Sequence, residues 1–295
     1  MAREKLSPSG WMLRQWRAAR GLSQLGLACE AGVSTRHLSF VETGRAEPSR
    51  ELLMKLAAAL GMPARDRNAL LAAAGYQPIY RETPIDAPAM AEVRKVLALI
   101  LRQHDPFAAC AFDRDFDVVM CNASFARFAA VLAPGAGEAG AVRSARSGSA
   151  APVGALEVTQ APRLNILDMT FDPASGLRER MRNWPEVAAA VLARARSALA
   201  MARDAYSRAI LDRLLEYPGV RELAAGSEAE IAGGLVIPLE VQLGPMVARF
   251  LTTISTLGTP QDVTLRELSI EAFHPADAET EALVRALAAD VDAVL

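Results

Sequence analysis

Hydrophobic positions along the chain follow two different periodicities. Up to about residue 75, apolar side chains recur at helical spacing in five short segments that are punctuated by serine and glycine. In residues 235–243, leucine, isoleucine and valine instead occupy every second position, which is typical of a half-buried β-strand. The pattern therefore predicts an α-helical domain of five short helices followed by an α+β domain.

The segment from Gln24 to Thr43 is the most distinctive part of the helical region. Five of its apolar side chains are expected to face inward from two short helices: Leu27, Ala31, Val33, Leu38 and Val41. Gly32 tolerates the positive φ of a tight turn, and Ser34 can cap the second helix, as Ser23 and Ser49 can cap its neighbours. A helix presented in this way fits the major groove of DNA, although an ordinary helical hairpin has the same pattern.

Residues 11–75 resemble the Xre-type helix-turn-helix family of DNA-binding domains. The resemblance is carried by Arg17-x-x-Arg-Gly-Leu-Ser-Gln24, Gly32-Val-Ser34, Glu42-x-Gly-Arg45, Pro48-Ser49 and Leu56-Ala-x-Ala-Leu60. It implies that Arg17 and Glu42 form a structural pair and that Gln24 binds phosphate. It also implies a wider DNA-binding set made up of Gln24, Ser34, Thr35, Arg36, Ser39 and Arg45. Within this set Arg36 is the natural guanine contact, because arginine binds guanine through two hydrogen bonds.

Charge is distributed unevenly between the two predicted domains. Residues 1–75 hold 11 Lys and Arg against 6 Asp and Glu, and the remainder holds 21 against 28. A basic first domain provides the local excess of cations that phosphate contacts need. The near-neutral total of the whole chain conceals this difference.

Residues 77–87 are predicted to be an extended linker, since prolines recur in and beside them. The chain then divides into a DNA-binding domain at 1–76, this linker, and a second domain at 88–295. A helix over about 88–103, with Asp86 as its cap, follows the linker. Its apolar stripe either couples the two domains or pairs with a second protomer.

The second domain opens with a hairpin signal, residues 106–112 and 117–121 around a polar turn, and Asn122 can cap the next helix. A Gly/Ala/Ser/Pro-rich insertion at 133–163 is expected to be mobile. A long helical region starts at about Asn183, which with Glu186 forms an expected capping box. Strands at 235–243, 247–256 and 263–273 complete a predicted five-stranded antiparallel sheet.

This arrangement resembles the MmyB-like ligand-binding domain, through Asn122-Ala-x-Phe, Asn165-Ile-Leu, Leu177-Arg, Asn183-Trp184 and the strands of 235–275. The resemblance implies a PAS-like fold whose cavity holds a small, largely apolar effector, with fatty acids as one precedent. The candidate lining residues are Phe112, Met120, Phe125, Phe128, Trp184, Phe250 and Phe273. Any of these apolar side chains can equally be plain core, and Trp184 in particular favours a core anchor.

Other classes of function find little support in the sequence. There is no glycine-rich phosphate loop, no metal-ligand spacing around the three histidines and no nucleophile elbow, so we expect neither an enzyme nor a resident cofactor or metal. No apolar run is long enough to cross a membrane, and the first residues lack the apolar core of a signal peptide, which favours the cytoplasm. Cys110 and Cys121 are expected at diagonal positions of the hairpin, beyond comfortable disulfide reach.

The leading hypothesis is a bacterial transcription regulator that binds a palindromic operator in double-stranded DNA as a homodimer and responds to a small apolar effector. The alternative is a DNA-binding interaction protein, of the antitoxin or scaffold type, whose second domain docks a protein partner. A co-purified small molecule would favour the first, and a stoichiometric protein partner the second.

Overall fold

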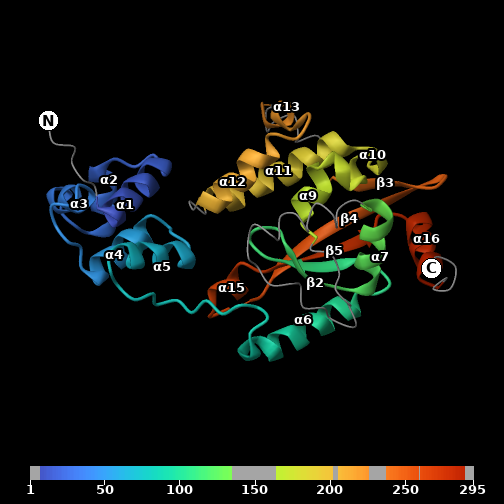
Figure 1. The fold of residues 1–295 in the computed structure, drawn as a ribbon, viewed down its shortest axis with the longest axis horizontal. Coiled ribbons are helices and arrows are strands. Elements are labelled where there is room, and N and C mark those ends of the chain that lie inside the picture. Colours follow the sequence, from blue (N-terminus) through green and yellow to red (C-terminus); the bar gives the residue numbers. More distant parts are fainter. Residues whose placement is uncertain (1–6, 135–163, 202–204, 226–236, 259, 290–295) are drawn as a thin grey trace. The chain divides into compact units, whose positions relative to one another are not determined.

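The computed structural model describes residues 7–134, 164–201, 205–225, 237–258 and 260–289. The chain forms two compact units: the first ends at Glu82 but also includes Met201 and Gln261–Val263, and the second contains the rest of the described residues from Thr83 onward. We call residues 7–82 the head and residues 83–289 the body, and describe each by itself (Figure 1). The mobile insertion expected at 133–163 lies outside the described residues from 135 onward.

The head consists of five helices, as the sequence predicts. They are α1 (Pro8–Ala19), α2 (Gln24–Ala31), α3 (Thr35–Glu42), α4 (Arg50–Ala59) and α5 (Ala64–Ala73). Four of them begin at a serine whose hydroxyl accepts a hydrogen bond from a backbone N–H of the first turn: Ser7, Ser23, Ser34 and Ser49. Gly32 ends α2 with a φ of 64°, which only glycine adopts readily. The capping residues expected for α2, α3 and α4 are thus confirmed.

The first helix begins earlier than its hydrophobic stripe indicates, because Ser7 caps it and Pro8 occupies its first position. The extra turn packs closely against α3. A Cβ atom on Gly10 would lie 2.5 Å from the carbonyl oxygen of Val41 and 2.7 Å from that of Glu42. Gly10 therefore permits a contact between α1 and α3 that no larger residue would allow.

The connection after α5 is held in place at both of its ends. In the head, the buried Asn68 side chain donates to the Tyr80 carbonyl and accepts from the backbone N–H groups of Ile79 and Tyr80. In the body, the Arg94 guanidinium donates to the carbonyls of Ile85 and Ala87. Much of the stretch expected to be a linker is therefore hydrogen-bonded to one unit or the other.

The body is built on a five-stranded sheet in which every neighbouring pair is antiparallel. Its order is β2 (Val118–Cys121), β1 (Ala109–Phe112), β5 (Ser269–Pro275), β4 (Met246–Thr256) and β3 (Leu239–Leu243). Pro238 directly precedes β3, which lies at the sheet edge as proline requires. This sheet confirms the predicted architecture of the second domain.

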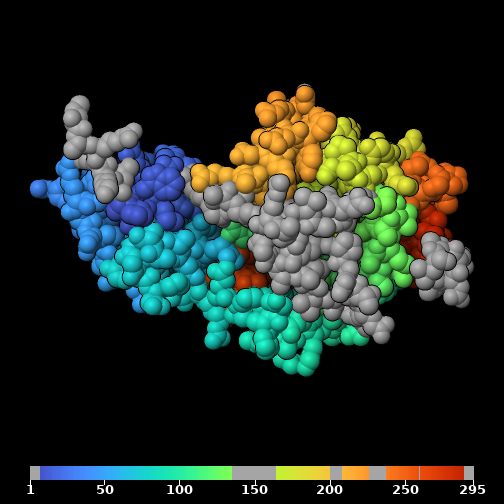
Figure 2. Space-filling model, in the orientation of Figure 1, coloured from blue at the N-terminus to red at the C-terminus, as the bar shows by residue number. Residues whose placement is uncertain are grey.

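Helices cover both faces of this sheet (Figure 1). On one face, α6 (Ala91–Gln103) buries Leu97 and Leu101 in a small cluster with Met120, Leu268 and Ile270. The other face carries the larger core. Its helices are α7 (Ala123–Leu132), α9 (Ile166–Phe171), α10 (Leu177–Arg180), α11 (Trp184–Met201), α12 (Ala205–Leu214), α13 (Val220–Ala225) and α16 (Ala278–Ala289). In the space-filling view, α10 to α13, in yellow and orange, lie next to one another (Figure 2).

Three short helical segments complete the described body: η1 (Pro88–Met90), η2 (Pro173–Ser175) and α15 (Val263–Arg266). The last of them corrects the strand expected from residue 263. Val263 and Thr264 are β-branched and favour a strand, but Val263 is buried at the start of this helical turn and the Arg266 side chain at its end donates back to the Pro260 carbonyl of the preceding loop. The strand begins only at Ser269.

Asn183 directly precedes α11, as expected, and its carbonyl accepts from the Val187 N–H, but its side chain has other partners than those of the expected capping box. Its side-chain oxygen accepts from the backbone N–H of Glu240, and its amide donates to the Pro238 carbonyl. The backbone N–H of Arg182 donates to the Glu240 carbonyl beside these bonds. The segment before α11 therefore covers the outer edge of β3, where backbone groups would otherwise lack partners.

The register of the first hairpin differs from expectation. Cys110 and Cys121 are direct partners across β1 and β2, because the strand register shifts between Ala111 and Phe112. The turn also contains Phe116 in the left-handed region, with a φ of 66°. Both thiols are free and buried; burial raises the pKa of Cys121 to about 11 and the pKa of Cys110 well above its usual range.

Candidate DNA-binding surface and ligand cavity

One face of α3 is fixed in the head core and the opposite face is open. Leu38 and Val41 are fully buried, whereas Ser34 and Arg36 are exposed and Thr35 and Ser39 are half-buried. The Arg36 guanidinium lies 5.4 Å from the centre of the Phe40 ring, within cation–π range. The helix thus presents short polar side chains and one arginine from a rigid base.

Arg45 lies in the loop after α3, and its side chain is exposed. Its backbone N–H donates to the Phe40 carbonyl at 2.8 Å, and the N–H of Ala46 donates to the same oxygen. The loop is therefore bound to the end of α3, which places Arg45 close to that helix. Phe40, which the sequence analysis overlooked, holds the loop and also lies beside Arg36.

The pair implied by the family resemblance is present in the head. Arg17 donates from Nε and Nη2 to the two carboxylate oxygens of Glu42 at 2.7 and 2.9 Å, and from Nη1 to the Leu22 carbonyl. The Glu42 side chain is only 2% exposed, and its hydrogen bond raises the pKa of Arg17 further. Gln24 donates its amide to the same carboxylate at 2.8 Å. One of the two N–H groups of this expected phosphate ligand is thus already occupied.

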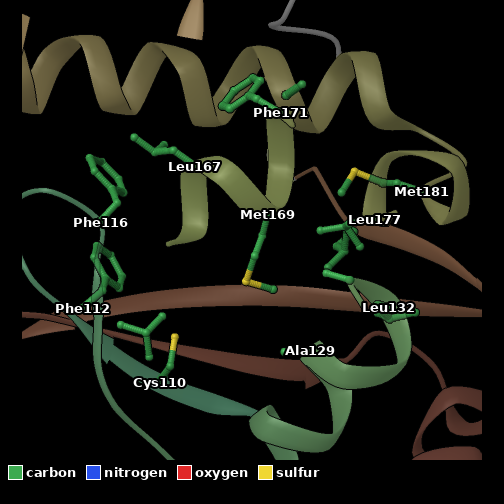
Figure 3. Packing of buried hydrophobic residues seen from close by; sticks show 14 of the residues in the cluster. Cys110, Phe112, Phe116, Ala129, Leu132, Leu167, Met169, Phe171, Leu177 and Met181 are labelled. Carbon is green, nitrogen blue, oxygen red and sulfur yellow. The ribbon is translucent and has the colours of Figure 1, made fainter. Parts of the chain in front are cut away.

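The body contains an apolar cavity of about 260 Å³ between the sheet and the helices that cover its larger core. Its lining residues come from α7, α9, α10, α11 and three strands. Figure 3 shows Met169 extending from α9 toward the sheet, with Leu177 and Met181 beside it. The cavity is therefore lined mainly by aliphatic and aromatic apolar side chains, the usual lining of small-molecule sites.

Three of the seven expected lining residues border this cavity: Phe125, Phe128 and Phe273. Phe250 packs behind them, with its ring 5.6 Å from that of Phe128. Met120 lies on the opposite face of the sheet, against α6. Successive side chains of a strand point to opposite faces of the sheet. Met120 is paired with Ala111 and so lies on the same face as Ala111, opposite to the face of Cys110.

The remaining two expected lining residues have other partners. Phe112 stacks on Phe116 with ring centres 5.6 Å apart. Trp184 donates its indole N–H to the Thr170 carbonyl at 2.9 Å, and the Arg178 guanidinium lies 3.7 Å from its ring centre. Trp184 is thus anchored in the core, the interpretation that its sequence position favoured.

A charged pair lines the cavity, and the sequence analysis missed both of its members. Nη1 of Arg194, on α11, lies 3.9 Å from Oε1 of Glu271, at the centre of β5. The Glu271 side chain is 9% exposed; burial raises its pKa, while Arg194 and the Thr252 hydroxyl oppose that change. The sequence did contain a signal for Glu271, because an acidic residue occupies a strand position that faces the core, where residues are normally apolar.

Within the described residues, no group of three or more His, Cys, Asp or Glu side chains is placed to hold a metal ion. Nor does any helix among them have the length and apolar character needed to span a bilayer. The two features that stand out are therefore the open face of α3 and the cavity of the body.

Comparisons with known proteins match both parts of the chain. A helix-turn-helix family model matches residues 13–66, and the model of the MmyB-like transcription regulator ligand binding domain matches residues 93–287. The chain therefore belongs to the MmyB-like transcription regulators. It is a DNA-binding transcription regulator with a ligand-binding-type C-terminal domain, a class whose members are generally not enzymes.

Two solved structures are similar to part of the chain. The restriction-modification controller protein C.AhdI from Aeromonas hydrophila is 35% identical over 22% of this chain and 98% of its own, with a TM-score of 0.21. The clp gene regulator ClgR from Corynebacterium glutamicum is 31% identical over 35% of this chain and 99% of its own, also with a TM-score of 0.21. A comparison with curated proteins found no match.

Proposed function

We propose that this protein binds a palindromic operator as a homodimer and changes its DNA affinity when a small apolar effector enters the body. The observation that carries the DNA-binding part is the position of α3, which is buried along Leu38 and Val41 and open along Thr35 and Arg36. A helix fixed from behind and polar in front is suited to the major groove.

In this proposal the side chains have different tasks. Arg36 contacts a guanine edge, and Thr35 and Ser39 contact neighbouring bases from the same side of α3. Ser34, whose hydroxyl accepts from the His37 N–H, mainly orients the helix, and Arg45 and Gln24 contact phosphates. Gln24 retains one amide N–H and its oxygen beyond the bond to Glu42.

The variant Arg36→Ala tests this arrangement. After operator selection with the full-length protein, we expect it to lose about 1–3 kcal/mol of discrimination at one base pair per half-site while keeping salt-dependent nonspecific binding. Arg221→Ala removes another exposed arginine, from α13, and serves as the matched control. Unchanged base preference in Arg36→Ala would contradict the role given to α3.

A homodimer is supported by the outer face of α6. Val96 and Leu99 are each 51% exposed and Ile100 is 37% exposed, although the opposite side of the helix is buried on the sheet. In an antiparallel pair of α6 helices, Val96 of each copy would face Leu99 of the other. The same pairing brings Glu92, near the start of one helix, beside Arg102, near the end of the other.

Leu99→Glu tests the dimer by sedimentation, with Glu179→Gln on α10 as the control. We expect Leu99→Glu to be a monomer that binds a half-site as well as the wild type but has lost the added affinity for the full palindrome. A Leu99→Glu protein that remains dimeric would rule out α6 as the interface.

The effector part of the proposal is supported by the cavity and its apolar lining. Native mass spectrometry of freshly purified full-length protein provides the test, with a co-purified small apolar molecule as the expected result. An empty cavity together with a stoichiometric protein partner would favour the interaction-protein alternative instead.

A further inference from the structure

The Arg194–Glu271 pair sets the chemistry of the ligand that the cavity accepts. This inference rests on the proposed effector-binding function of the body. Apart from the hydroxyls of Thr170 and Thr252, these two residues provide the polar side chains of the lining. Any ligand that fills the apolar part of the cavity must bring its own polar end to this pair.

The surroundings of Glu271 are defined by the strands on either side of it. Across the sheet it faces Cys110 on β1 and Ile254 on β4, and Thr252 lies one pleat further along β4. Above the sheet, α11 supplies Arg194, and Cys121 is the next thiol beyond Cys110. Arg194 is the one cation facing Glu271 among these described neighbours, and both thiols are neutral because burial raises their pKa.

The pair is incompletely bonded. Its closest charged atoms are 3.9 Å apart, whereas charge-assisted hydrogen bonds are about 2.7–2.9 Å long. The Arg194 Nε is buried and has no hydrogen-bond partner among the described residues. The guanidinium lies over the rings of Phe112 and Phe116, at 5.6 and 5.5 Å, so apolar surfaces surround it on that side. Arg194 can therefore donate to a ligand, and Glu271 can accept from one.

We propose that the polar end of the effector accepts a hydrogen bond from Arg194 and donates one to Glu271. A primary carboxamide has both groups, and so does a carboxylic acid in its protonated form. A carboxylate has no donor and would place a second negative charge beside Glu271. Two carboxyl groups so close together hold a proton between them. A fatty-acid-like molecule thus binds together with one proton, shared by its own carboxyl group and Glu271.

Titration calorimetry of the full-length protein with three probes of equal chain length tests this inference. The probes are decanoic acid, decanamide and methyl decanoate, measured at several pH values and in buffers of different ionisation enthalpy. We expect the acid to take up close to one proton and to lose about tenfold in affinity for each pH unit through the alkaline part of the range. The amide should change less than about twofold, and the ester, which has no donor, should bind weakly throughout.

The variant Glu271→Gln removes the group that shares the proton and keeps the shape of the cavity, so it tests the proton linkage alone. The amide of the new side chain donates to a carboxylate, so decanoic acid should bind the variant without proton uptake and more tightly at alkaline pH than it binds the wild type. Glu240→Gln, on the exposed side of β3, is the matched control and should retain the wild-type pH slope. Thermal melting of both variants checks that each remains folded.

The outcomes distinguish the inference from the function on which it rests. Binding of decanoic acid without proton uptake, or with a slope that survives in Glu271→Gln, would overturn the inference and leave an effector-binding body intact. Failure of all three probes at every pH would remove both the inference and the proposed class of effector. Proton uptake that disappears in Glu271→Gln would support both.

Discussion

The Arg17–Glu42 pair of the head and the Arg194–Glu271 pair of the body join the same residue types, and they differ in how completely they are hydrogen-bonded. Arg17 and Glu42 make two short hydrogen bonds, and Leu22 and Gln24 occupy further donors and acceptors of the pair. Arg194 and Glu271 are 3.9 Å apart, with a buried nitrogen unused. The same residue types therefore stabilise a fold when their bonding is complete and are available to a ligand when it is not.

Breaking the fully hydrogen-bonded Arg17–Glu42 pair should have the largest effect on stability. Glu42→Ala leaves the Arg17 guanidinium without its carboxylate in a site where the glutamate is 2% exposed, and we expect a loss of about 3–5 kcal/mol in head stability. Hydrogen exchange of head amides in the full-length protein measures it. Glu51→Ala removes an exposed ion pair with Lys55 and should cost less than about 0.5 kcal/mol. Equal losses in the two variants would show that burial does not distinguish them.

A smaller effect is expected when only the third hydrogen-bond donor to Glu42, the Gln24 amide, is removed. Gln24→Ala deletes one hydrogen bond to a buried charge, so we expect a loss of about 1.5–3 kcal/mol in head stability, again followed by hydrogen exchange. The same variant should reduce DNA affinity similarly for all sequences, because a phosphate contact carries no base information. Full head stability in this variant would show that the bond to Glu42 contributes little.

The incompletely bonded Arg194–Glu271 pair should have the smallest effect on stability, and that effect should be a loss of stability as pH rises. Burial raises the folded-state pKa of Glu271 above its unfolded value, so the folded protein binds this proton more tightly. Body stability should therefore fall as pH rises from about 4.5 through the folded pKa, by at most about 1.4 kcal/mol per pH unit. Melting of the wild type and Glu271→Gln across this window measures the difference. A slope that persists in the variant would belong to another group.

Local signals in the sequence predicted the head in detail. Ser23, Ser34 and Ser49 cap helices and Gly32 ends one, because each of these roles depends on a residue and its close neighbours. Gly10 gave no such signal, because its role depends on the close approach of α1 to α3, two helices that are separated in the sequence. The exposed side of α3 followed from the same helical periodicity.

The body was predictable in architecture but less so in its site. Alternation showed which side chains leave a strand on the same face, and the family resemblance gave the candidates Phe125, Phe128 and Phe273, which border the cavity. It could not show the register shift beside Phe112 that brings Cys110 opposite Cys121. Nor could it show that Arg194, in an alanine-rich helix, meets Glu271 from a strand 77 positions later, because only packing brings them together.

The hydrogen bonds that Asn68 and Arg94 make to the connecting segment leave only a short length of chain between the two units that can change conformation. Residues 79 and 80 are hydrogen-bonded on one side and residues 85 and 87 on the other, and the Arg81 carbonyl and the Glu82 carboxylate between them also have partners, so few positions are left to pivot. At roughly 3.3–3.6 Å per residue, such a joint cannot stretch far. An operator whose half-sites are moved apart by even a few base pairs should consequently be rejected, and inserting glycines at Thr83 should restore tolerance.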